Sequence, residues 1–426
     1  MTYLPRVVDS VLEEALTGLP AVAIDGAKGV GKSMSAERIA RSVLRLDRPE
    51  ELAILQADRD RIDRLDPPVL IDEWQLDPPI WDAVRRSVDA DRTPGRFILT
   101  GSANPHDASI HSGAGRIVRI RMRPLSFFER QRQLPTVSLR SLLLGEDVAI
   151  EGQTGVGLEE YVTEMLSSGL PGIRTSAPST ISSQLDSYLS YALSHEVPAL
   201  GAVVRRPQAL AAWLRAYAAA TSTSASFEAI ADAVSKEVRP TRATIGDYRE
   251  ALSQLWLLDQ VPAWVPTGNE LTRLGQAPKH QLADPALAAQ LLRTKRDALL
   301  AATGRADRTA AYRRLRTGPF LGSLFEALAT LSVRTCVQAL TSDVSHLRTH
   351  SGDHEVDLIV EAPDGRILAI EVKLAANIDD KDVRHLNWLR AKIGDELLDR
   401  VIITTGTYAY RRQDGVVVVP LALLGP

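Results

Sequence analysis

A single glycine-rich segment constrains this chain more than any other feature of its sequence. Residues 26–33 read Gly-Ala-Lys-Gly-Val-Gly-Lys-Ser, which matches the phosphate-binding pattern GxxxxGK[ST]. The apolar residues 21–25 before it favour a strand, and residues 33–40 after it favour a helix. A loop between a strand and a helix N-terminus turns its backbone N–H groups inward, where they hold phosphate oxygens. The segment therefore predicts a site for a nucleoside triphosphate, which we expect to be ATP.

The residues of this loop have separate expected roles. We expect the Lys32 ammonium to reach the β- and γ-phosphates and the Ser33 hydroxyl to complete the coordination of Mg²⁺. ATP and Mg²⁺ are thus the predicted cofactors. The predicted nucleotide-binding residues are Gly26, Lys28, Gly29, Val30, Gly31, Lys32, Ser33 and Met34.

A second segment completes the expected nucleotide site. Residues 68–75 read Pro-Val-Leu-Ile-Asp-Glu-Trp-Gln, an apolar strand that ends in two acids. We expect Asp72 to hold Mg²⁺ and Glu73 to be the catalytic residue that polarises an attacking water. Alone, the two acids would indicate no more than a solvated strand end. After the upstream loop they predict a hydrolase rather than a small-molecule kinase.

A third apolar strand, residues 96–102, ends in small hydroxyl residues. Ligand groups gather at the carboxyl ends of strands in a parallel sheet. We therefore expect Thr100 or Ser102 to orient the γ-phosphate or the attacking water, and Thr100 is a predicted catalytic residue. An ordinary transition from strand to turn uses the same residue types, and this alternative stays open.

Arginines are concentrated just after this strand. Residues 111–132 contain six of them and only one acid, Glu129. Ring ATPases complete their site with an arginine from a neighbouring subunit, and we expect Arg116 to have this catalytic role in a homo-oligomer. The others are expected to form a basic face. The six are Arg116, Arg119, Arg121, Arg123, Arg130 and Arg132.

Composition and length indicate a soluble protein of several domains. The 426 residues suit about three domains, which we expect at 1–135, 136–270 and 271–426. The single cysteine, Cys336, excludes an intrachain disulfide framework and leaves too few thiols for a zinc site. No apolar run approaches the length of a membrane span, and the N-terminus lacks a signal-peptide core. We therefore expect a cytoplasmic protein that does not enter a membrane.

Contact with DNA, if it occurs, must come from local patches, because the net charge is −3. Residues 208–221, 227–234 and 241–257 read as three helices and 258–265 as a strand, the order of a winged helix. The third helix would enter a DNA groove, or the unit would only pack domains together. Residues 292–318 hold eight basic residues against two acids, which indicates either a phosphate-contacting surface or a solvated linker.

A second group of charged residues lies near the C-terminus. Residues 354–360 alternate as a half-buried strand does, 363–365 (Pro-Asp-Gly) predict a turn, and 367–373 resume the alternation, so we expect a β-hairpin. Two carboxylates and a lysine at the end of a hairpin suit a metal-dependent phosphodiesterase, as in restriction-endonuclease-like nucleases. The predicted catalytic residues are Asp357, Glu371 and Lys373, and the predicted metal ligands are Asp357, Glu371 and Glu326.

Several segments taken together resemble one known family. They are 26–33, 71–75 (Ile-Asp-Glu-Trp-Gln), 98–102, 115–116 followed by 124–129 (Pro-Leu-Ser-Phe-Phe-Glu), 168–171, 282–285, 355–357 and 371–373. The chain is similar along nearly its whole length to prokaryotic AAA-type ATPases that join a P-loop domain to a C-terminal domain of unknown function with a restriction-endonuclease-like core. Gln75 and the Pro-Leu-Ser-Phe segment are the most specific parts of the pattern.

The resemblance implies an α/β protein with a P-loop NTPase (AAA+-like) parallel sheet, a helical winged-helix middle region and a C-terminal restriction-endonuclease-like α/β domain. Two functions remain open. In the first, an Mg²⁺-dependent ATPase acts on DNA, which its C-terminal site cuts. In the second, the ATPase is a nucleotide-gated binding switch, and the nuclease-like module is catalytically inert. Asp357, Glu371 and Lys373 favour the first function, and the near-neutral charge favours the second.

Overall fold

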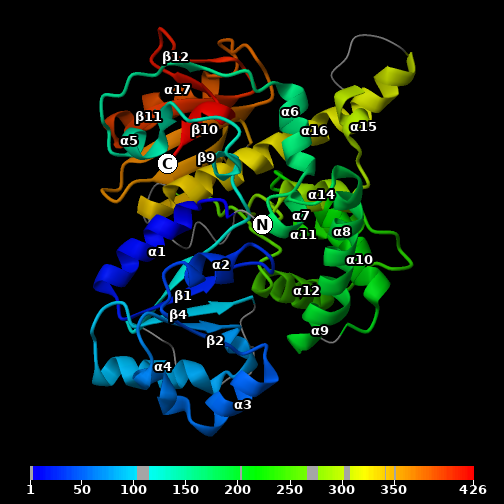
Figure 1. Cartoon of the computed structure of the whole chain (residues 1–426). Coiled ribbons are helices and arrows are strands. Elements are labelled where there is room, and N and C mark those ends of the chain that lie inside the picture. Colours follow the sequence, from blue (N-terminus) through cyan, green and yellow to red (C-terminus); the bar gives the residue numbers. More distant parts are fainter. Residues whose placement is uncertain are drawn as a thin grey trace.

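The computed structural model describes residues 3–102, 115–201, 204–265, 277–301, 308–340, 342–349 and 352–426, with the side chains of 308–317 outside the description. Figure 1 shows three parts: a blue sheet at one end, a green helical region beside it, and an orange-red sheet at the other end. The long helix α16 (Arg308–Cys336) crosses the middle.

The N-terminal part contains a parallel sheet of five strands in the order β2-β3-β4-β1-β5. In this register Asp72 lies beside Thr100, and Asp25 lies beside Gly101 and Arg121. The carboxyl ends of the central strands therefore meet at one edge, where the glycine-rich loop begins. The strands are β1 (Ala21–Asp25), β2 (Ser42–Arg45), β3 (Val69–Asp72), β4 (Phe97–Gly101) and β5 (Ile117–Arg121).

Helices cover both faces of this sheet. Strands β1, β3 and β4 are buried along their whole length, which explains their continuous apolar sequences. Side chains alternate across the sheet, so Val22 and Ile24 pack with α1 while Ala21 and Ala23 pack with α4. The helices are α1 (Val7–Gly18), α2 (Lys32–Glu37), α3 (Pro49–Ala57) and α4 (Pro79–Ala90).

The middle region is helical, and the three helices predicted there correspond to α10, α11 and α12. Ser226 and Thr241 cap α11 and α12 by accepting hydrogen bonds from backbone N–H groups. Residues 258–261 then pair with 279–282 through the bridges Leu258 to Leu282 and Val261 to Lys279. The winged-helix interpretation of this order stays a prediction. The helices are α6 (Leu158–Leu166), α7 (Pro171–Arg174), α8 (Pro178–Tyr191), α9 (Val197–Ala199), α10 (Pro207–Ala219), α11 (Phe227–Asp232), α12 (Arg242–Gln254), α14 (Pro285–Leu291) and α15 (Arg296–Ala301).

The C-terminal part contains a mixed sheet of seven strands in the order β7-β12-β13-β11-β10-β9-β8. The predicted hairpin is confirmed: β9 and β10 pair antiparallel, and Gly365 takes a left-handed conformation in the turn. Helix α17 (Arg384–Ile393) packs on β9, β10 and β11. The strands are β7 (Gly152–Gln153), β8 (Asp343–Arg348), β9 (Glu355–Glu361), β10 (Ile367–Lys373), β11 (Leu397–Thr404), β12 (Tyr408–Arg411) and β13 (Val417–Pro420).

Residues 137–153 join this C-terminal part rather than the helical region, which differs from the domain division expected from the sequence. Strand β6 (Val137–Ser138) pairs with β14 (Leu424–Gly425), β7 pairs with β12, and α5 (Leu139–Leu143) contacts β10 and β11. The sequence did not indicate this connection, because strands of two residues carry no periodic pattern.

Helix α16 supplies much of the common core. Its side chains Phe325 and Leu328 belong to one buried cluster that also contains Trp213 of α10 and Ile370 of β10. In the described part of the chain, the segment Gly318–Leu340 is long and apolar enough to cross a membrane, with a mean hydropathy of 1.3, and is 72% buried inside the molecule. The expectation that no apolar run reaches this length was therefore wrong. Burial in the common core explains why this helix is apolar.

The arginines after β4 pair with acids of the same chain, most of them buried, and so do not form the basic face that the sequence suggested. The Asp259 carboxylate lies 2.9 Å from Arg121 Nη1, 2.7 Å from Arg123 Nε and 2.7 Å from Arg334 Nη1. Burial alone would raise the pKa of Asp259, but the three guanidinium groups outweigh it and hold that pKa well below its ordinary value. This acid therefore joins β5, the segment after α12 and helix α16.

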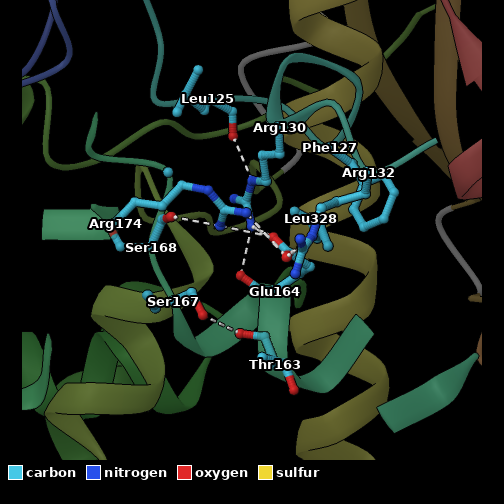
Figure 2. A network of polar contacts seen from close by, with 12 residues as sticks. Leu125, Phe127, Arg130, Arg132, Thr163, Glu164, Ser167, Ser168, Arg174 and Leu328 are labelled. Atoms are coloured by element: carbon cyan, nitrogen blue, oxygen red, sulfur yellow. Dashed lines mark hydrogen bonds and ion pairs between the residues drawn. The ribbon is translucent and has the colours of Figure 1, made fainter. Parts of the chain in front are cut away.

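A second acid does the same for the helical region. Glu164 of α6, 1% exposed, lies 3.2 Å from Arg130 Nη1, 2.7 Å from Arg132 Nε and 2.8 Å from Arg174 Nη1. Figure 2 shows the three guanidinium groups converging on this carboxylate, with Arg130 also donating to the Leu125 carbonyl. The segment after β5 is thus fixed to α6 and α7.

We predict that Asp259→Asn will destabilise the protein by about 3–5 kcal/mol, because three guanidinium groups would lose the carboxylate that they share. The pKa of Asp259 is lower in the folded protein than in the unfolded chain, where it is about 4. The carboxylate therefore contributes its full stabilisation above pH ~4, and this contribution is lost as the pH falls through the folded pKa. The urea midpoint at neutral pH measures the effect. Asp364→Asn, in the exposed turn of the β9–β10 hairpin, is the control, and equal midpoints for both variants would contradict the prediction.

Candidate nucleotide site and C-terminal carboxylate cluster

The glycine-rich loop lies between β1 and α2, as predicted, and its glycines are required by geometry. A Cβ atom at Gly26 would lie 2.2 Å from the Met122 carbonyl oxygen. Gly31 has a φ of 104° and caps α2, a conformation that L side chains rarely adopt. The chain after β5 therefore holds the loop from one side, while Met34 at the start of α2 stays exposed.

Lys32 is folded into this loop. The residue is 6% exposed. Its ammonium donates to the carbonyl oxygens of Gly26 at 2.8 Å and Ala27 at 3.0 Å. Burial lowers the pKa of Lys32 to about 8, although Glu73, Asp25 and Asp72 favour its charged form. Within the described residues, the close acceptors of this buried ammonium are neutral carbonyls. Such an ammonium suits an anionic ligand, which provides stronger acceptors.

Ser33, Asp72 and Thr100 meet beside the loop. The Asp72 carboxylate accepts hydrogen bonds from the Ser33 hydroxyl at 2.7 Å and the Thr100 hydroxyl at 2.5 Å. A hydroxyl and a carboxylate are oxygen ligands of the kind that Mg²⁺ prefers, so this donor set fits the cation that the sequence predicts. Thr100 is directed at Asp72, and its contact orients that carboxylate.

Glu73 lies at the end of β3 in a left-handed conformation, with a φ of 56°. The Gln75 amide donates to the Glu73 carboxylate and lies 3.4 Å from the Ser102 hydroxyl, which is itself 3.3 Å from Glu73. Gly101 permits this arrangement, because a Cβ there would lie 2.8 Å from Gln75 Oε1. A left-handed non-glycine residue costs free energy, and these contacts offset that cost by fixing the carboxylate beside Asp72. The sequence analysis assigned no role to Gln75.

Three contacts connect the loop to distant parts of the chain, and none of them was predicted. Lys28 forms an ion pair with Glu196 at 3.3 Å, and the Tyr188 hydroxyl donates to the Lys28 carbonyl at 3.3 Å. Arg6 donates to the Val30 carbonyl at 2.7 Å while its Nε binds Glu129 at 3.1 Å. The helical region and the N-terminal segment thus both contact the phosphate loop.

Arg116 precedes β5, at the edge of the sheet opposite the loop. Strand β5 runs parallel to β1, with Ile117 beside Ala21 and Arg121 beside Asp25. The Arg116 Nε atom lies 2.8 Å from the Asp89 carboxylate on α4. Arg116 therefore does not reach the nucleotide site of its own chain, and its predicted role requires a neighbouring subunit.

The predicted C-terminal residues are brought together, but with a lysine that the sequence analysis missed. Asp357 accepts from the Val372 N–H at 2.9 Å, and Lys373 donates to Glu371 at 2.6 Å. Lys279 lies between Asp357 and Glu326, with its Nζ atom 2.9 Å and 2.8 Å from their carboxylate oxygens. In the part of the chain that the structure describes, no group of three histidines, cysteines or acids is arranged to hold a metal ion.

The protonation of this cluster follows from burial and charge. Burial and the nearby Asp357 raise the pKa of Glu371 well above its ordinary value, and they raise the pKa of Glu326 to about 8. Burial opposes ionisation of Asp357 as well, but Lys279 and Lys373 outweigh it and lower the pKa of Asp357. Charge thus favours the ionised form of Asp357, whereas Glu326 and Glu371 are held toward their neutral forms.

The two surfaces considered for DNA carry exposed basic residues in the described part of the chain, namely Arg242, Arg293, Lys295 and Arg296, and some of these pair with acids. On α12, Tyr248 is 3% exposed, Arg249 lies over the Phe227 ring at 3.6 Å, and Arg242 is 3.5 Å from Glu228. In the basic segment 292–318, Arg296 pairs with Glu159 at 2.8 Å. The side chains of 302–317, which include most of its arginines, lie outside the described residues.

With this geometry established, comparison with known families is informative. Residues 19–131 match the family model described as an AAA domain. The N-terminal domain is an AAA-type P-loop ATPase domain. The match covers the glycine-rich loop, Asp72, Glu73 and Thr100, and it supports ATP binding and ATPase activity.

The rest of the chain matches families without an assigned function. Residues 158–298 match a domain of unknown function (DUF8612), and residues 321–424 match another (DUF4143). The restriction-endonuclease-like interpretation of the C-terminal sheet therefore stays a prediction.

One solved structure and the curated proteins complete the comparison. The structure described as the Walker-type ATPase PABY2304 of Pyrococcus abyssi is 18% identical, with a TM-score of 0.39, over 68% of this chain and 96% of that chain. None of the curated proteins matches this sequence.

We predict that Gln75→Ala will lower kcat for ATP about tenfold or more while leaving KM for ATP unchanged, because Gln75 orients Glu73 and does not lie at the phosphate loop. Steady-state ATPase kinetics measure both constants. Gln153→Ala, at an exposed position of β7, is the matched control. A Gln75→Ala variant with the parental kcat would show that Glu73 needs no such support.

Proposed function

We propose that this protein hydrolyses ATP with Mg²⁺ at the edge of its parallel sheet, and that the hydrolytic cycle controls a binding module formed by the rest of the chain. One observation carries the first half of the proposal. Lys32, Ser33, Asp72 and Glu73 come from two separate segments and converge beside a loop whose backbone suits phosphate.

The residues divide the work of hydrolysis between them. Backbone N–H groups of the loop and the Lys32 ammonium bind the phosphates, which replace the Gly26 and Ala27 carbonyls as partners of that ammonium. Ser33 and Asp72 would hold Mg²⁺, which would neutralise negative charge on the phosphates. Thr100 keeps the Asp72 carboxylate in place.

Glu73 makes the reaction hydrolysis rather than transfer to another substrate. Its carboxylate orients a water toward the γ-phosphate and accepts the proton that this water loses. Gln75 and Ser102 keep the side chain at the end of β3. A kinase would instead need room here for a second substrate and its own base.

The C-terminal part supports the second of the two functions inferred from the sequence. Lys279 lies among the acids that would bind a catalytic metal, and the arginines of residues 119–132 pair with acids of the same chain. Both observations favour a nucleotide-gated switch with an inert module over an enzyme that cuts DNA. DNA remains one partner that such a module would bind, and the cytoplasm is the proposed compartment.

We predict different defects for two changes in the nucleotide site. Lys32→Ala should weaken ATP binding, because it removes the ammonium that contacts the phosphates. Glu73→Gln should keep ATP binding but lower kcat about 10²–10⁴-fold, because it removes only the base. Titration with a fluorescent ATP analogue and a phosphate-release assay separate the two effects. Glu14→Gln, on an exposed position of α1, serves as the control, and hydrolysis at the parental rate by Glu73→Gln would exclude Glu73 as the base.

We further propose assembly into a homo-oligomer, in which Arg116, which lies away from the site of its own chain, completes the site of a neighbouring subunit. We predict that mixing Arg116→Ala with Glu73→Gln restores part of the ATPase activity that each variant lacks, because a Glu73→Gln subunit still donates its arginine to an intact site. Specific activity should also rise with protein concentration.

The control mixture is Lys32→Ala with Glu73→Gln, in which every nucleotide site is defective, so that no activity should return. A monomeric mass in the presence of ATP, together with specific activity that does not depend on concentration, would contradict assembly. If Arg116→Ala keeps the parental ATPase activity while the protein still assembles, only the choice of Arg116 is contradicted.

A further inference from the structure

The side chain of Lys279 occupies the centre of the C-terminal carboxylate cluster. Its Nζ atom lies 2.8 Å from Glu326, 2.9 Å from Asp357 and 3.4 Å from Glu355. The lysine side chain is 1% exposed, whereas the Asp357 and Glu326 side chains are 13% and 16% exposed. One ammonium thus contacts three acids, which come from two elements, α16 and β9.

A divalent cation does not fit this arrangement. Mg²⁺ needs carboxylate oxygens at about 2.0–2.1 Å, and the oxygens of Asp357 and Glu326 nearest the cluster already contact the ammonium. The second Asp357 oxygen accepts the Val372 N–H at 2.9 Å. Glu371 is bound by Lys373 at 2.6 Å. A metal at this point would also place two positive groups within contact distance in a buried site, which is unfavourable.

The backbone fixes Lys279 in this position. Lys279 and Val261 exchange two main-chain hydrogen bonds, both of 2.9 Å, so the residue is held in a short antiparallel pairing. The next residue, His280, donates its N–H to the Thr223 carbonyl at 2.8 Å and contacts the Ala225 carbonyl through its ring at 2.7 Å. Moving the lysine away would require breaking this pairing as well as its ion pairs.

We propose that the Lys279 ammonium is the resident cation of this cluster. It takes the place that a catalytic divalent metal has in a nuclease, and it ties the paired segments 258–261 and 279–282 to β9 and α16. The C-terminal module is then a metal-free binding unit. This inference deepens the inert-module part of the proposed function and is independent of ATP hydrolysis at the P-loop.

Removing the lysine should open the site. We expect nucleotide-free Lys279→Met to bind about one Mn²⁺ per chain, at least about tenfold more tightly than the parent protein does, because methionine is of similar length and leaves the carboxylates unpaired. Isothermal titration with Mn²⁺, read together with the electron paramagnetic resonance of the free ion, measures this. Lys279→Met/Asp357→Asn should lose the gained site, and Lys295→Met, at an exposed lysine, should behave as the parent does.

The parent protein gives a test that does not depend on how Lys279→Met folds. Without nucleotide, the parent protein and Asp357→Asn should bind the same amount of Mn²⁺. With Mn²⁺ present, the parent protein should cleave no DNA. Mn²⁺ binding or DNA cleavage by the parent that Asp357→Asn abolishes would overturn the proposal, as would a folded Lys279→Met that binds no Mn²⁺. ATP hydrolysis measured on the same samples shows separately whether the P-loop proposal holds.

Discussion

Buried pairing between arginines and acids holds the parts of this molecule together. The segment that leaves the ATPase sheet carries arginines which pair with Asp259 and Glu164, and those two acids belong to the middle of the chain. Unpaired guanidinium groups are expensive to bury, whereas a carboxylate with several of them is stable in its charged form. These ion pairs therefore fix the ATPase domain, the helical region and helix α16 relative to one another. Arg123 and Asp259, for example, are more than a hundred residues apart in the sequence.

The same pairing reaches the nucleotide site. Arg6 binds Glu129 in this arginine-rich segment and also holds the Val30 carbonyl of the phosphate loop. On the other side of the loop, Lys28 binds Glu196 of the helical region. A triphosphate that changes the conformation of the loop would act on both contacts. This connection gives a physical route by which a nucleotide-gated switch would affect the rest of the chain.

The sequence predicted the local features well and the distant partners poorly. The glycine-rich loop, the strand that ends at Asp72 and the β9–β10 hairpin follow from spacing and alternation within a few residues, and each appears where it was expected. Asp357, Glu371, Lys373 and Glu326 were likewise predicted to lie together. Lys279 was missed because its partners lie 47 and 78 residues away, and no local pattern marks a lysine that will be buried among acids.

The basic character of residues 116–132 was misinterpreted for the same reason. A run of arginines looks like a surface for an anion when its acids are elsewhere in the chain. The structure supplies them as Asp25, Asp89, Asp259 and Glu164. The chemistry of a short motif therefore depends on the side chains that the fold places next to it. At the C-terminal cluster, the neighbouring side chain is the ammonium of Lys279.

The central claim is that this chain carries one metal-dependent site, at the P-loop, and that its second carboxylate cluster is satisfied by its own lysine. Anomalous diffraction from crystals grown with Mn²⁺ and a non-hydrolysable ATP analogue tests both halves at once. The account predicts one strong peak per chain, between Ser33, Asp72 and the phosphates, and none among Asp357, Glu371 and Glu326. A peak in the C-terminal cluster with Lys279 displaced, or no peak beside the nucleotide, would contradict it.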